Sequence, residues 1–325
     1  MNGDISVSVV IPAHNAEATL ARALDSVLAQ SRRASEIIVV DDASTDGTAS
    51  VAKSYAGRVT ILVFPNRLGA AAARNAGVRA AAGDWIAFLD ADDEWLPAKL
   101  ERQAAALSEA RDASFVFCAS EEFAPDGRSL GDTFRSHPVI AGKDAWKALL
   151  AVNFVASPTV MAPRELLLRL GGFDESLKVA EDQDMWIRLA LEGPPAYVPE
   201  SLVRVHVRPE SLSSWRLSDQ YAYTLPMIER HLKALDGRLG RRQARAILGA
   251  RLNRIGLTAC IHGNLAAGLG MIFRSALLGY RPFRSLLALV KAPMAAFASA
   301  RRRAVRPPPA DGHPKETRLC VHWFF

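Results

Sequence analysis

Short apolar runs alternate with stretches of helical periodicity in the first part of the chain. β-Branched apolar runs predict buried strands, and apolar residues spaced three or four apart predict helices. The strands are expected at 6–11, 36–40, 60–64 and 85–89, and the helices at 16–30 and 68–82. Strands that alternate with helices predict an α/β fold with a mostly parallel sheet and helical crossovers. Ligands bind such sheets outside the carboxyl ends of the strands.

The pattern changes in the second half of the chain. Residues 112–142 are looser and contain the turn Pro125-Asp126-Gly127, which predicts a hairpin. Further strands are expected at 156–161 and 203–207, with helices at 163–170, 180–191 and, after Ser218, at about 219–235, 241–262, 265–279 and 284–299. The polar tail from Arg301 predicts disorder. We therefore expect an α/β domain at 1–215, a basic helical region at 216–300 and a disordered basic tail at 301–325.

A stretch of 19 residues at 255–273 carries no formal charge, which is long enough to be considered as a membrane span. His262-Gly263-Asn264 in its middle predicts a turn, so we favour a helical hairpin instead. Two interpretations stay open: a hairpin packed on the catalytic domain, or a surface that leans on a bilayer. The N-terminus has no basic region before its short apolar run and does not resemble a signal peptide.

Charge is divided unevenly along the chain. Residues 1–215 hold 21 Lys and Arg against 29 Asp and Glu, whereas residues 216–325 hold 19 against 5. A basic, half-apolar region suits an anionic surface such as a membrane face. No aromatic platform is interleaved with these charges, which disfavours nucleic acid as a partner. Three scattered cysteines fit neither a disulfide framework nor a metal knuckle, and they favour a reducing compartment.

The acidic motif Asp90-Ala91-Asp92 directly follows the predicted strand at 85–89. The strand end fixes the backbone, so the alternate carboxylates can face one ligand. Carboxylate oxygens suit Mg²⁺ or Mn²⁺, and either ion can bridge a diphosphate. The alternative is a cap for the helix expected near Pro97. Asp93 could supply that cap alone, which would leave Asp90 and Asp92 unexplained.

Several longer strings place the chain near a known family. SVVIPAHNAEATLARALDSVLAQ, EIIVVDDASTDGT and NRLGAAAARNAGVRAAAGDWIAFLDADDEW cover residues 6–95, and GGFDESL and AEDQDMWIRLA follow at 171–177 and 180–190. Together they resemble the family 2 glycosyltransferases of the GT-A fold, to about residue 215. The resemblance implies a Rossmann-like sheet flanked by helices and an inverting transfer from a nucleotide diphosphate sugar. The motifs say almost nothing about which sugar is moved.

The resemblance assigns nucleotide contacts to the loop after the first strand. Pro12, Ala13 and Asn15 match the positions that lie under the base and ribose in similar enzymes. Glu17, at the start of the next helix, is expected to reach the nucleotide. Its alternative role is first-turn support of the helix dipole.

Asp42, which ends the second strand, matches the aspartate that binds the uracil edge in the family. The alternative for Asp42 is an Asx turn with Ser44. We favour the nucleotide role, because Asp41 could supply that turn. Family members often carry Gly where this chain has Ala43.

Arg74 lies among small residues on its predicted helix, and the resemblance makes it a nucleotide contact. A guanidinium suits a base carbonyl or a phosphate. The resemblance further implies that Asp90 contacts the ribose and that Asp92 holds the metal, whose role is to stabilise the departing diphosphate.

Asp182, beside Glu181 at the start of a predicted helix, is our candidate for the base that deprotonates the acceptor hydroxyl. A helix N-terminus stabilises a carboxylate, whereas a neighbouring acid raises its pKa. Capping is the alternative role, because acids crowd the first turns of helices. Asp184 is a rival, but at its spacing it should point elsewhere on the helix.

His206 is a candidate third metal ligand or diphosphate contact, although a lone histidine on a strand is more often structural. Arg204 and Arg208 flank it on the same strand face and could hold phosphate, of the donor or of a lipid-phosphate acceptor.

We expect a UDP-sugar as donor and a growing glycan or its lipid carrier as acceptor, in the cytoplasm or at the inner face of the membrane. Two other enzyme classes fit poorly. A sugar nucleotidyltransferase requires a glycine-rich loop after the first strand, which this chain lacks, and Asp93 and Glu94 do not fit the motif of a phosphatase of the aspartyl-phosphate type. The remaining alternative is an inactive nucleotide-sugar-binding or scaffold protein of a polysaccharide assembly.

Overall fold

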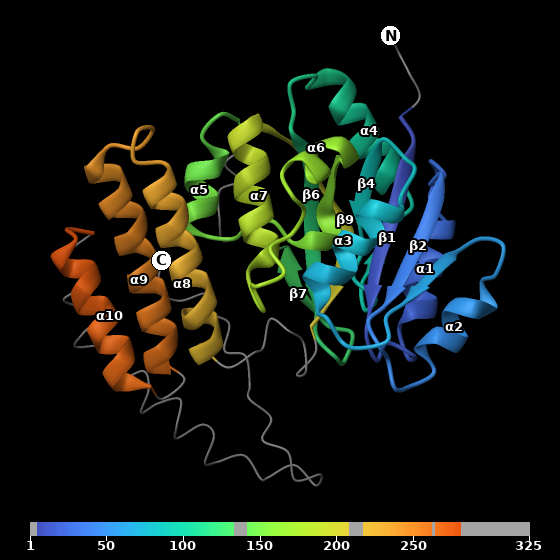
Figure 1. The fold of residues 1–325 in the computed structure, drawn as a ribbon, viewed down its shortest axis with the longest axis horizontal. Coiled ribbons are helices and arrows are strands. Elements are labelled where there is room, and N and C mark those ends of the chain that lie inside the picture. Colours follow the sequence, from blue (N-terminus) through green and yellow to red (C-terminus); the bar gives the residue numbers. More distant parts are fainter. Residues whose placement is uncertain (1–4, 133–141, 208–216, 262–263, 281–325) are drawn as a thin grey trace, which may run out of the picture. The chain divides into compact units, whose positions relative to one another are not determined.

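The computed structural model describes residues 5–132, 142–207, 217–261 and 264–280 (Figure 1). The chain divides into two compact units. The first comprises residues 1–149 and 153–208, and the second comprises residues 150–152 and 209–325. The helix expected at 284–299, the tail from Arg301, and Arg208 lie outside the described residues.

The first unit is built on one nine-stranded sheet, in the order β3-β2-β1-β4-β8-β6-β9-β5, with β7 paired to β6. The strands are β1 (Val7–Ala13), β2 (Glu36–Asp41), β3 (Thr60–Val63), β4 (Trp85–Phe88), β5 (Glu94–Trp95), β6 (Phe115–Phe123), β7 (Ser129–Asp132), β8 (Val160–Pro163) and β9 (Pro195–His206). The first four strands pair in parallel, as the sequence predicts. The other half mixes directions, because β8 runs antiparallel to both β4 and β6.

Helices cover both faces of this sheet (Figure 1). They are α1 (Leu20–Leu28), α2 (Thr48–Ser54), α3 (Ala70–Ala80), α4 (Lys99–Glu109), α5 (Ala145–Ala151), α6 (Arg164–Arg169) and α7 (Glu181–Glu192), with a 3₁₀ turn at Ser157–Thr159. Alternate strand residues such as Val9 and Ile11 join Leu20 and Leu100 in one core. Trp186 of α7 stacks on Phe115 and packs against Phe88 on the opposite face. The result is the three-layer α/β arrangement expected from the pattern.

Close approach of α3 to the sheet depends on small residues. A Cβ atom on Gly77 would clash with the side chain of Val10 on β1. Arg74 and Asn75, in the middle of α3, are 5% and 4% exposed. The alanine-rich stretch therefore brings two polar side chains into the interior of the molecule.

Several boundaries differ from the prediction. Helix α1 begins at Leu20 rather than at residue 16. Residues 16–19 precede it as a turn that is tied to the start of α2, since Ala16 N–H donates to Thr48 Oγ1 at 2.7 Å. The strand expected at 156–161 starts as a 3₁₀ turn and becomes β8 only at Val160. Strand β9 begins at Pro195, well before the predicted residue 203. The helix expected near Pro97 is α4, whereas helices α2 and α5 and strand β5 were not predicted.

The second unit is helical in its described part. It contains α8 (Leu217–Ala234), α9 (Arg241–Ile261) and α10 (Leu265–Leu277). Helices α9 and α10 form a close pair, because Gly256 and Gly268 leave no room for a Cβ atom between them. No helix of the described ranges is long and apolar enough to cross a membrane.

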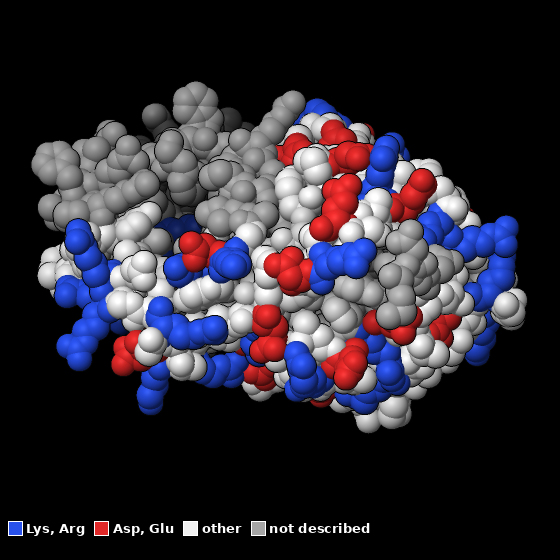
Figure 2. Space-filling view, turned by 90° about the horizontal axis from the view of Figure 1, so that it is seen from above, with Lys and Arg blue, Asp and Glu red and all other residues white. Residues whose placement is uncertain are grey.

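Charge differs between the two units, as counted along the sequence. Figure 2 shows acidic and basic side chains mixed over the first unit, whereas Lys and Arg outnumber Asp and Glu over the helices of the second. This surface view agrees with the uneven charge of the sequence.

Candidate active site

An open pocket of about 600 Å³ lies at the carboxyl ends of β1, β2 and β3. It is lined by residues of the three loops that follow these strands: His14, Asn15, Ala43, Ser44, Thr45, Val63, Phe64, Pro65, Asn66 and Arg67. The edge of a parallel sheet is where such folds bind ligands. Only Asn15 of this lining was singled out from the sequence. The loop after β3 was given no role from the sequence, although Asn66 and Arg67 begin one of the strings that resemble the family.

Hydrogen bonds between the loops after β1 and β2 fix the floor of this pocket. Asn15 Oδ1 accepts from the Thr45 N–H at 2.9 Å, and Asn15 N–H donates to Ser44 Oγ at 2.9 Å. His14 Nδ1 lies 2.7 Å from the carbonyl oxygen of Asp42. Asn15 and Ala43 have φ angles of 49° and 54°. The left-handed conformation of Ala43 is one that glycine adopts more easily.

The two aspartates at the end of β2 have different roles. Asp41 Oδ1 accepts from the Ser44 N–H at 3.0 Å, so Asp41 supplies the Asx turn. Asp42 is 4% exposed, and its two oxygens accept from the backbone N–H groups of Leu68 and Gly69 at 2.6 and 2.8 Å. Asp42 therefore anchors the loop before α3. Its contact with a nucleobase stays a prediction.

Pro12 and Ala13 end strand β1, in register with Val40 and Asp41 of β2. Glu17 lies beyond them, in the turn before α1. Its carboxylate accepts from the Gly47 N–H at 3.0 Å, so it ties this turn to the loop before α2. Nucleotide contacts of these three residues also stay predictions.

Arg74 connects two acidic segments that are far apart in the sequence. Its Nη2 donates to Asp90 Oδ1 at 2.9 Å, and its Nη1 donates to Glu181 Oε1 at 2.7 Å. Burial lowers the pKa of Arg74, but the nearby Asp90, Glu181 and Asp182 outweigh this effect and raise it. The buried Nε has no hydrogen-bond partner among the described residues. The guanidinium thus holds the Asp90 loop and the start of α7 together and keeps one donor unused.

The acidic loop after β4 is fastened on three sides. Asp93 N–H donates to the Asp90 carbonyl at 3.1 Å, and Arg22 Nη2 donates to the Asp92 carbonyl at 2.6 Å. Asp93 Oδ1 accepts from the His206 N–H at 2.9 Å. Burial raises the pKa of Asp93 well above its usual range, and Asp90 and Asp92 add to this effect.

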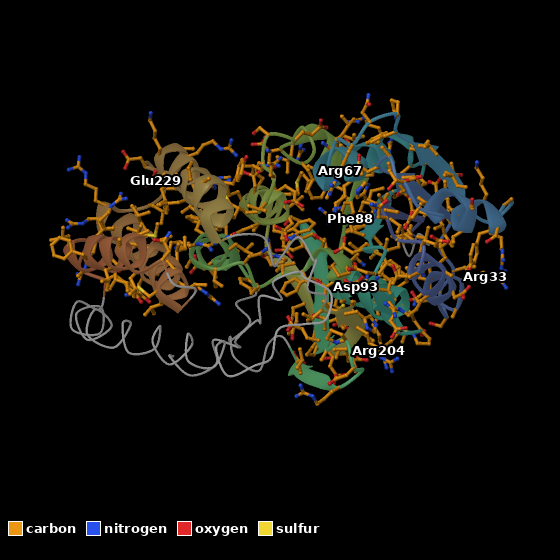
Figure 3. The ribbon with its side chains drawn as sticks, turned by 90° about the horizontal axis from the view of Figure 1, so that it is seen from below. Arg33, Arg67, Phe88, Asp93, Arg204 and Glu229 are labelled. Carbon is orange, nitrogen blue, oxygen red and sulfur yellow. The ribbon has the colours of Figure 1, made fainter. Side chains whose placement is uncertain are left out.

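The capping role considered for Asp93 is wrong. Helix α4 begins at Lys99, its N-cap residue is Ala98, and no side chain caps it. Asp93 instead links the acidic loop to the end of β9, where it lies close to Arg204 (Figure 3).

His206 lies beside this loop, but it turns toward a different carboxylate. Its Nε2 is 3.4 Å from Glu94 Oε1, which is also 3.2 Å from Arg204 Nη1. No cluster of three or more His, Cys, Asp or Glu side chains that could hold a metal occurs in the described ranges. The β9 backbone is bound to Asp93 and the imidazole faces Glu94, and the metal-ligand and diphosphate roles of His206 stay predictions.

The donor chemistry of Asp90 and Asp92 nevertheless fits a hard divalent cation. Mg²⁺ is typically bound through one or two carboxylates, with water and phosphate oxygens completing its coordination. Both side chains are partly exposed, and the backbone between them is held in a turn. The residues present thus match an ion that a diphosphate would share.

Asp182 is a partly buried carboxylate in the first turn of α7. Its Oδ1 accepts from the Gln183 N–H at 2.6 Å, and its Oδ2 accepts from Asn153 Nδ2 at 3.0 Å. Burial raises the pKa of Asp182 to about 7, and Glu181 adds to the rise, whereas Arg74, Gln183 and Asn153 oppose it. From the sequence we expected Glu181 to raise the pKa of Asp182, but not the larger cause of the rise, which is burial. Asn153 was missed, because an isolated amide carries no signal.

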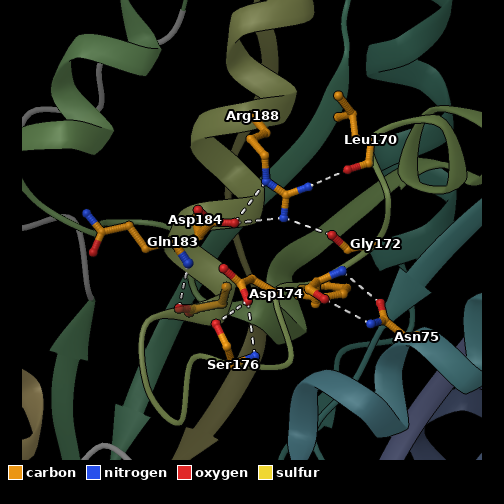
Figure 4. Close-up of polar contacts among 10 residues, drawn as sticks. Asn75, Leu170, Gly172, Asp174, Ser176, Gln183, Asp184 and Arg188 are labelled. Atoms are coloured by element: carbon orange, nitrogen blue, oxygen red, sulfur yellow. Dashed lines mark hydrogen bonds and ion pairs between the residues drawn. The ribbon is translucent and has the colours of Figure 1, made fainter. Parts of the chain in front are cut away.

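The rival carboxylate, Asp184, has a structural role. It is 1% exposed and accepts from Arg188 Nε and Nη2 at 2.8 and 2.7 Å. Arg188 also donates to the carbonyl oxygens of Leu170 and Gly172, so the pair fastens α7 to the preceding loop (Figure 4).

Asn75 fastens the same loop to α3. Its side chain exchanges two hydrogen bonds with the backbone of Phe173, at 2.9 and 2.7 Å. Phe173 in turn packs edge-on against Trp186 of α7 at 5.8 Å between ring centroids. Three segments that are distant in the sequence therefore pack together and position Glu181 and Asp182: residues 74–75, 171–177 and 180–190.

Comparison with known proteins agrees with this geometry. The family model "Glycosyl transferase family 2" matches residues 8–162. TuaG of Bacillus subtilis, assigned as a glycosyltransferase of teichuronic acid biosynthesis, is 32% identical over 69% of this chain and 88% of its own length. An uncharacterized glycosyltransferase of Haemophilus influenzae is 29% identical over 59% of this chain, and the match spans 64% of that protein, which is less than two thirds of its length.

Solved structures share the fold. TarS 1–349 of S. aureus in complex with UDP-GlcNAc superimposes with a TM-score of 0.67 and 20% identity, over 91% of this chain and 90% of that one. The mannosyltransferase PcManGT of Pyrobaculum calidifontis, in complex with GDP-Man and Mn²⁺, gives a TM-score of 0.57 and 22% identity, over 90% and 86%. With the parallel strands, the acidic loop after β4 and the Glu181–Asp182 helix start all in place, the chain belongs to glycosyltransferase family 2 and has the GT-A fold.

Proposed function

We propose that this protein is an inverting glycosyltransferase that moves a sugar from a nucleotide diphosphate donor to an acceptor hydroxyl, with Asp182 as the base. The observation that carries the proposal is the placement of Asp182. Its pKa is raised to about 7, and its neighbour Glu181 is joined through Arg74 to Asp90 of the acidic loop. A base with a pKa near neutrality is suited to proton abstraction at physiological pH.

In the proposed reaction, one displacement occurs at the anomeric carbon. The acceptor oxygen attacks that carbon while its proton passes to an Asp182 oxygen, and the bond from the carbon to the diphosphate oxygen breaks. The diphosphate leaves with the electron pair of that bond. A single displacement inverts the configuration, and protonated Asp182 then returns its proton to solvent.

On the donor side, the pocket formed by the loops after β1, β2 and β3 is proposed to take the base and ribose, with Pro12, Ala13, Asn15, Glu17 and Asp42 nearby. The unused Nε–H of Arg74 is a donor for an oxygen of the nucleotide. Asp92, with Asp90, would hold Mg²⁺ or Mn²⁺. When bound, the cation supplies Lewis-acid stabilisation of the leaving diphosphate.

A UDP-sugar is the proposed donor, and a growing glycan or its lipid carrier is the proposed acceptor. Support comes from TarS, whose structure contains UDP-GlcNAc, and from TuaG, which is assigned to teichuronic acid biosynthesis. We further propose polysaccharide assembly in the cytoplasm or at the inner face of the membrane, with the basic C-terminal region toward the lipid. That region carries 19 Lys and Arg against 5 Asp and Glu.

The alternative is a nucleotide-sugar-binding or scaffold protein without turnover. It is disfavoured because a carboxylate with a raised pKa costs folding stability when it is ionised, and such groups cluster at functional sites. A protein without turnover would gain nothing from a partly exposed Asp182 whose pKa lies near neutral pH.

The test is calorimetric titration of UDP, GDP, CDP and dTDP, each with and without Mn²⁺, on the wild type and on Asp92→Ala. We expect one nucleotide to bind in a metal-dependent way, and Asp92→Ala to abolish that binding. Asp236→Asn, an exposed acid of the second unit, is the matched control and should bind as the wild type does. Binding of no nucleotide by the wild type would contradict the donor site.

Turnover is tested separately with the nucleotide that binds. Asp182→Asn should bind that nucleotide and fail to transfer the sugar, and the anomeric configuration of the wild-type product should be inverted by NMR. Transfer at the wild-type rate in Asp182→Asn, or a retained configuration, would rule out the proposed mechanism. Binding without turnover in the wild type, across donors and acceptors, would favour the scaffold alternative.

A further inference from the structure

The outward face of α10 is an apolar strip on an otherwise cationic unit. Phe273 and Leu277 are 53% and 64% exposed, and they lie one turn apart on this helix. Ala266 and Gly270 continue the strip toward the helix start, at the spacing of one helix face. Large exposed apolar side chains in such an arrangement mark interaction surfaces more often than isolated ones do.

The other face of α10 explains why this strip points outward. Ser275 Oγ donates to the Gly249 carbonyl of α9 at 2.7 Å, and Ile272 is fully buried. A Cβ atom on Gly256 of α9 would clash with the backbone of Gly268. Because α10 turns Gly268, Ile272 and Ser275 onto α9, the strip with Phe273 and Leu277 is held on the opposite side.

The charge around the strip is of one sign. Arg274 is exposed beside Phe273, and Arg245 of α9 donates to the Leu277 carbonyl at 3.2 Å. Along the sequence, residues 237–310 contain 14 Lys and Arg and no Asp or Glu. A run of this length without one acid favours a polyanionic partner.

We infer that the α10 strip, defined by Ala266, Gly270, Phe273 and Leu277, docks on the surface of an anionic lipid bilayer. Phe273 and Leu277 would enter the acyl boundary, and Arg245 and Arg274 would meet the lipid phosphates. The combination of an exposed Phe and Leu with flanking arginines is that of a helix lying in a membrane interface. A polynucleotide would use the charges, but the strip offers it one aromatic ring and no stacking platform. This inference deepens the membrane placement given in the proposed function and rests on it, but it does not depend on the transfer reaction.

The test is flotation of the full-length protein with two kinds of vesicle: phosphatidylcholine alone, and phosphatidylcholine with phosphatidylglycerol in equal parts. We expect binding to the anionic vesicles and little to the neutral ones. The double variant Phe273→Ser/Leu277→Ser should weaken partitioning by about tenfold or more. Arg245→Glu/Arg274→Glu should weaken it by a similar factor, and added salt should weaken the wild type.

Matched controls are available on the first unit. Leu168→Ser removes an apolar side chain that is 39% exposed on α6, and Arg33→Glu/Lys53→Glu reverses two exposed charges. Both controls should bind vesicles as the wild type does, and circular dichroism should show that every variant is folded. Equal loss in the controls, unchanged binding by the strip variants, or wild-type binding to duplex DNA but not to vesicles would overturn the inference.

Discussion

The pKa of Asp182 can be moved in either direction by changing its neighbours, which gives a test of its role as the base. Asn153 donates to Asp182 Oδ2 at 3.0 Å and stabilises the ionised carboxylate. Asn153→Ala removes this bond and should raise the pKa of Asp182 above about 7. Glu181→Gln removes a neighbouring negative charge and should lower it, while the amide oxygen can still accept from Arg74.

The size of the shift follows from the exposure of the partner. A hydrogen bond to a charged group contributes about 1.5–3 kcal/mol, but Asn153 is exposed and water replaces part of it. We therefore expect a rise of about half to one pH unit, since one unit corresponds to about 1.4 kcal/mol. The ionised form of Asp182 is the active one. At a pH below its pKa, kcat/KM should therefore be roughly three- to tenfold lower in Asn153→Ala than in the wild type.

The measurement is kcat/KM for the acceptor across a pH series at saturating donor. The acidic limb should move to higher pH in Asn153→Ala and to lower pH in Glu181→Gln. Asn264→Ala is the matched control, since this amide caps α10 in the second unit and touches neither carboxylate. An unmoved limb in Asn153→Ala, or shifts of the two variants in the same direction, would refute the assignment.

Three further predictions concern stability. Folding raises the pKa of Asp182 to about 7, so the protein loses stability as pH rises from about 4 to about 7. Asp182→Asn should therefore raise the free energy of unfolding in urea at pH 8 by up to about 4 kcal/mol and change it little at pH 4; an equal gain at both pH values would argue against the shift. Ala43→Gly should stabilise by about 1 kcal/mol in urea unfolding, because φ is 54°, whereas Ala266→Gly in a helix should destabilise by a similar amount. Arg74→Met removes the cation that pairs with the buried Glu181 and the partly exposed Asp90 and should cost about 3–5 kcal/mol by urea unfolding; a loss below 1 kcal/mol would show that the pairs contribute little.

The sequence predicted the parallel half of the fold well, because β1, β2 and β4 are buried on both faces and appear as continuous apolar runs. It predicted the second half poorly. Strand β9 begins with Pro195-Ala196-Tyr197, a segment without alternation, and it becomes a strand through its long parallel pairing with β6. That pairing is a tertiary effect that no local pattern reveals.

The sequence predicted which residues belong to the candidate site better than it predicted the contacts between them. The sequence placed Asp90, Arg74 and Asp182 in one site, but the ion pairs that join Arg74 to Asp90 and Glu181 span 16 and 107 residues. The sequence likewise offered His206 as a metal ligand, which stays a prediction, but it did not indicate that the His206 ring faces Glu94. Spacing along a chain indicates which groups are present, but the direction of a side chain depends on packing between distant segments.

Among the residues that the structure describes, the non-glycine positions with positive φ are Asn15, Ala43 and Ala180. The first two line the pocket, and the third immediately precedes Glu181 and Asp182. A side chain at such a position narrows the conformations open to the loop, so the loop loses less entropy when a ligand orders it. Glycine in place of Ala43 and Ala180 would therefore give a more stable protein with a less rigid site, and selection for thermal stability and selection for ligand affinity would favour different residues there.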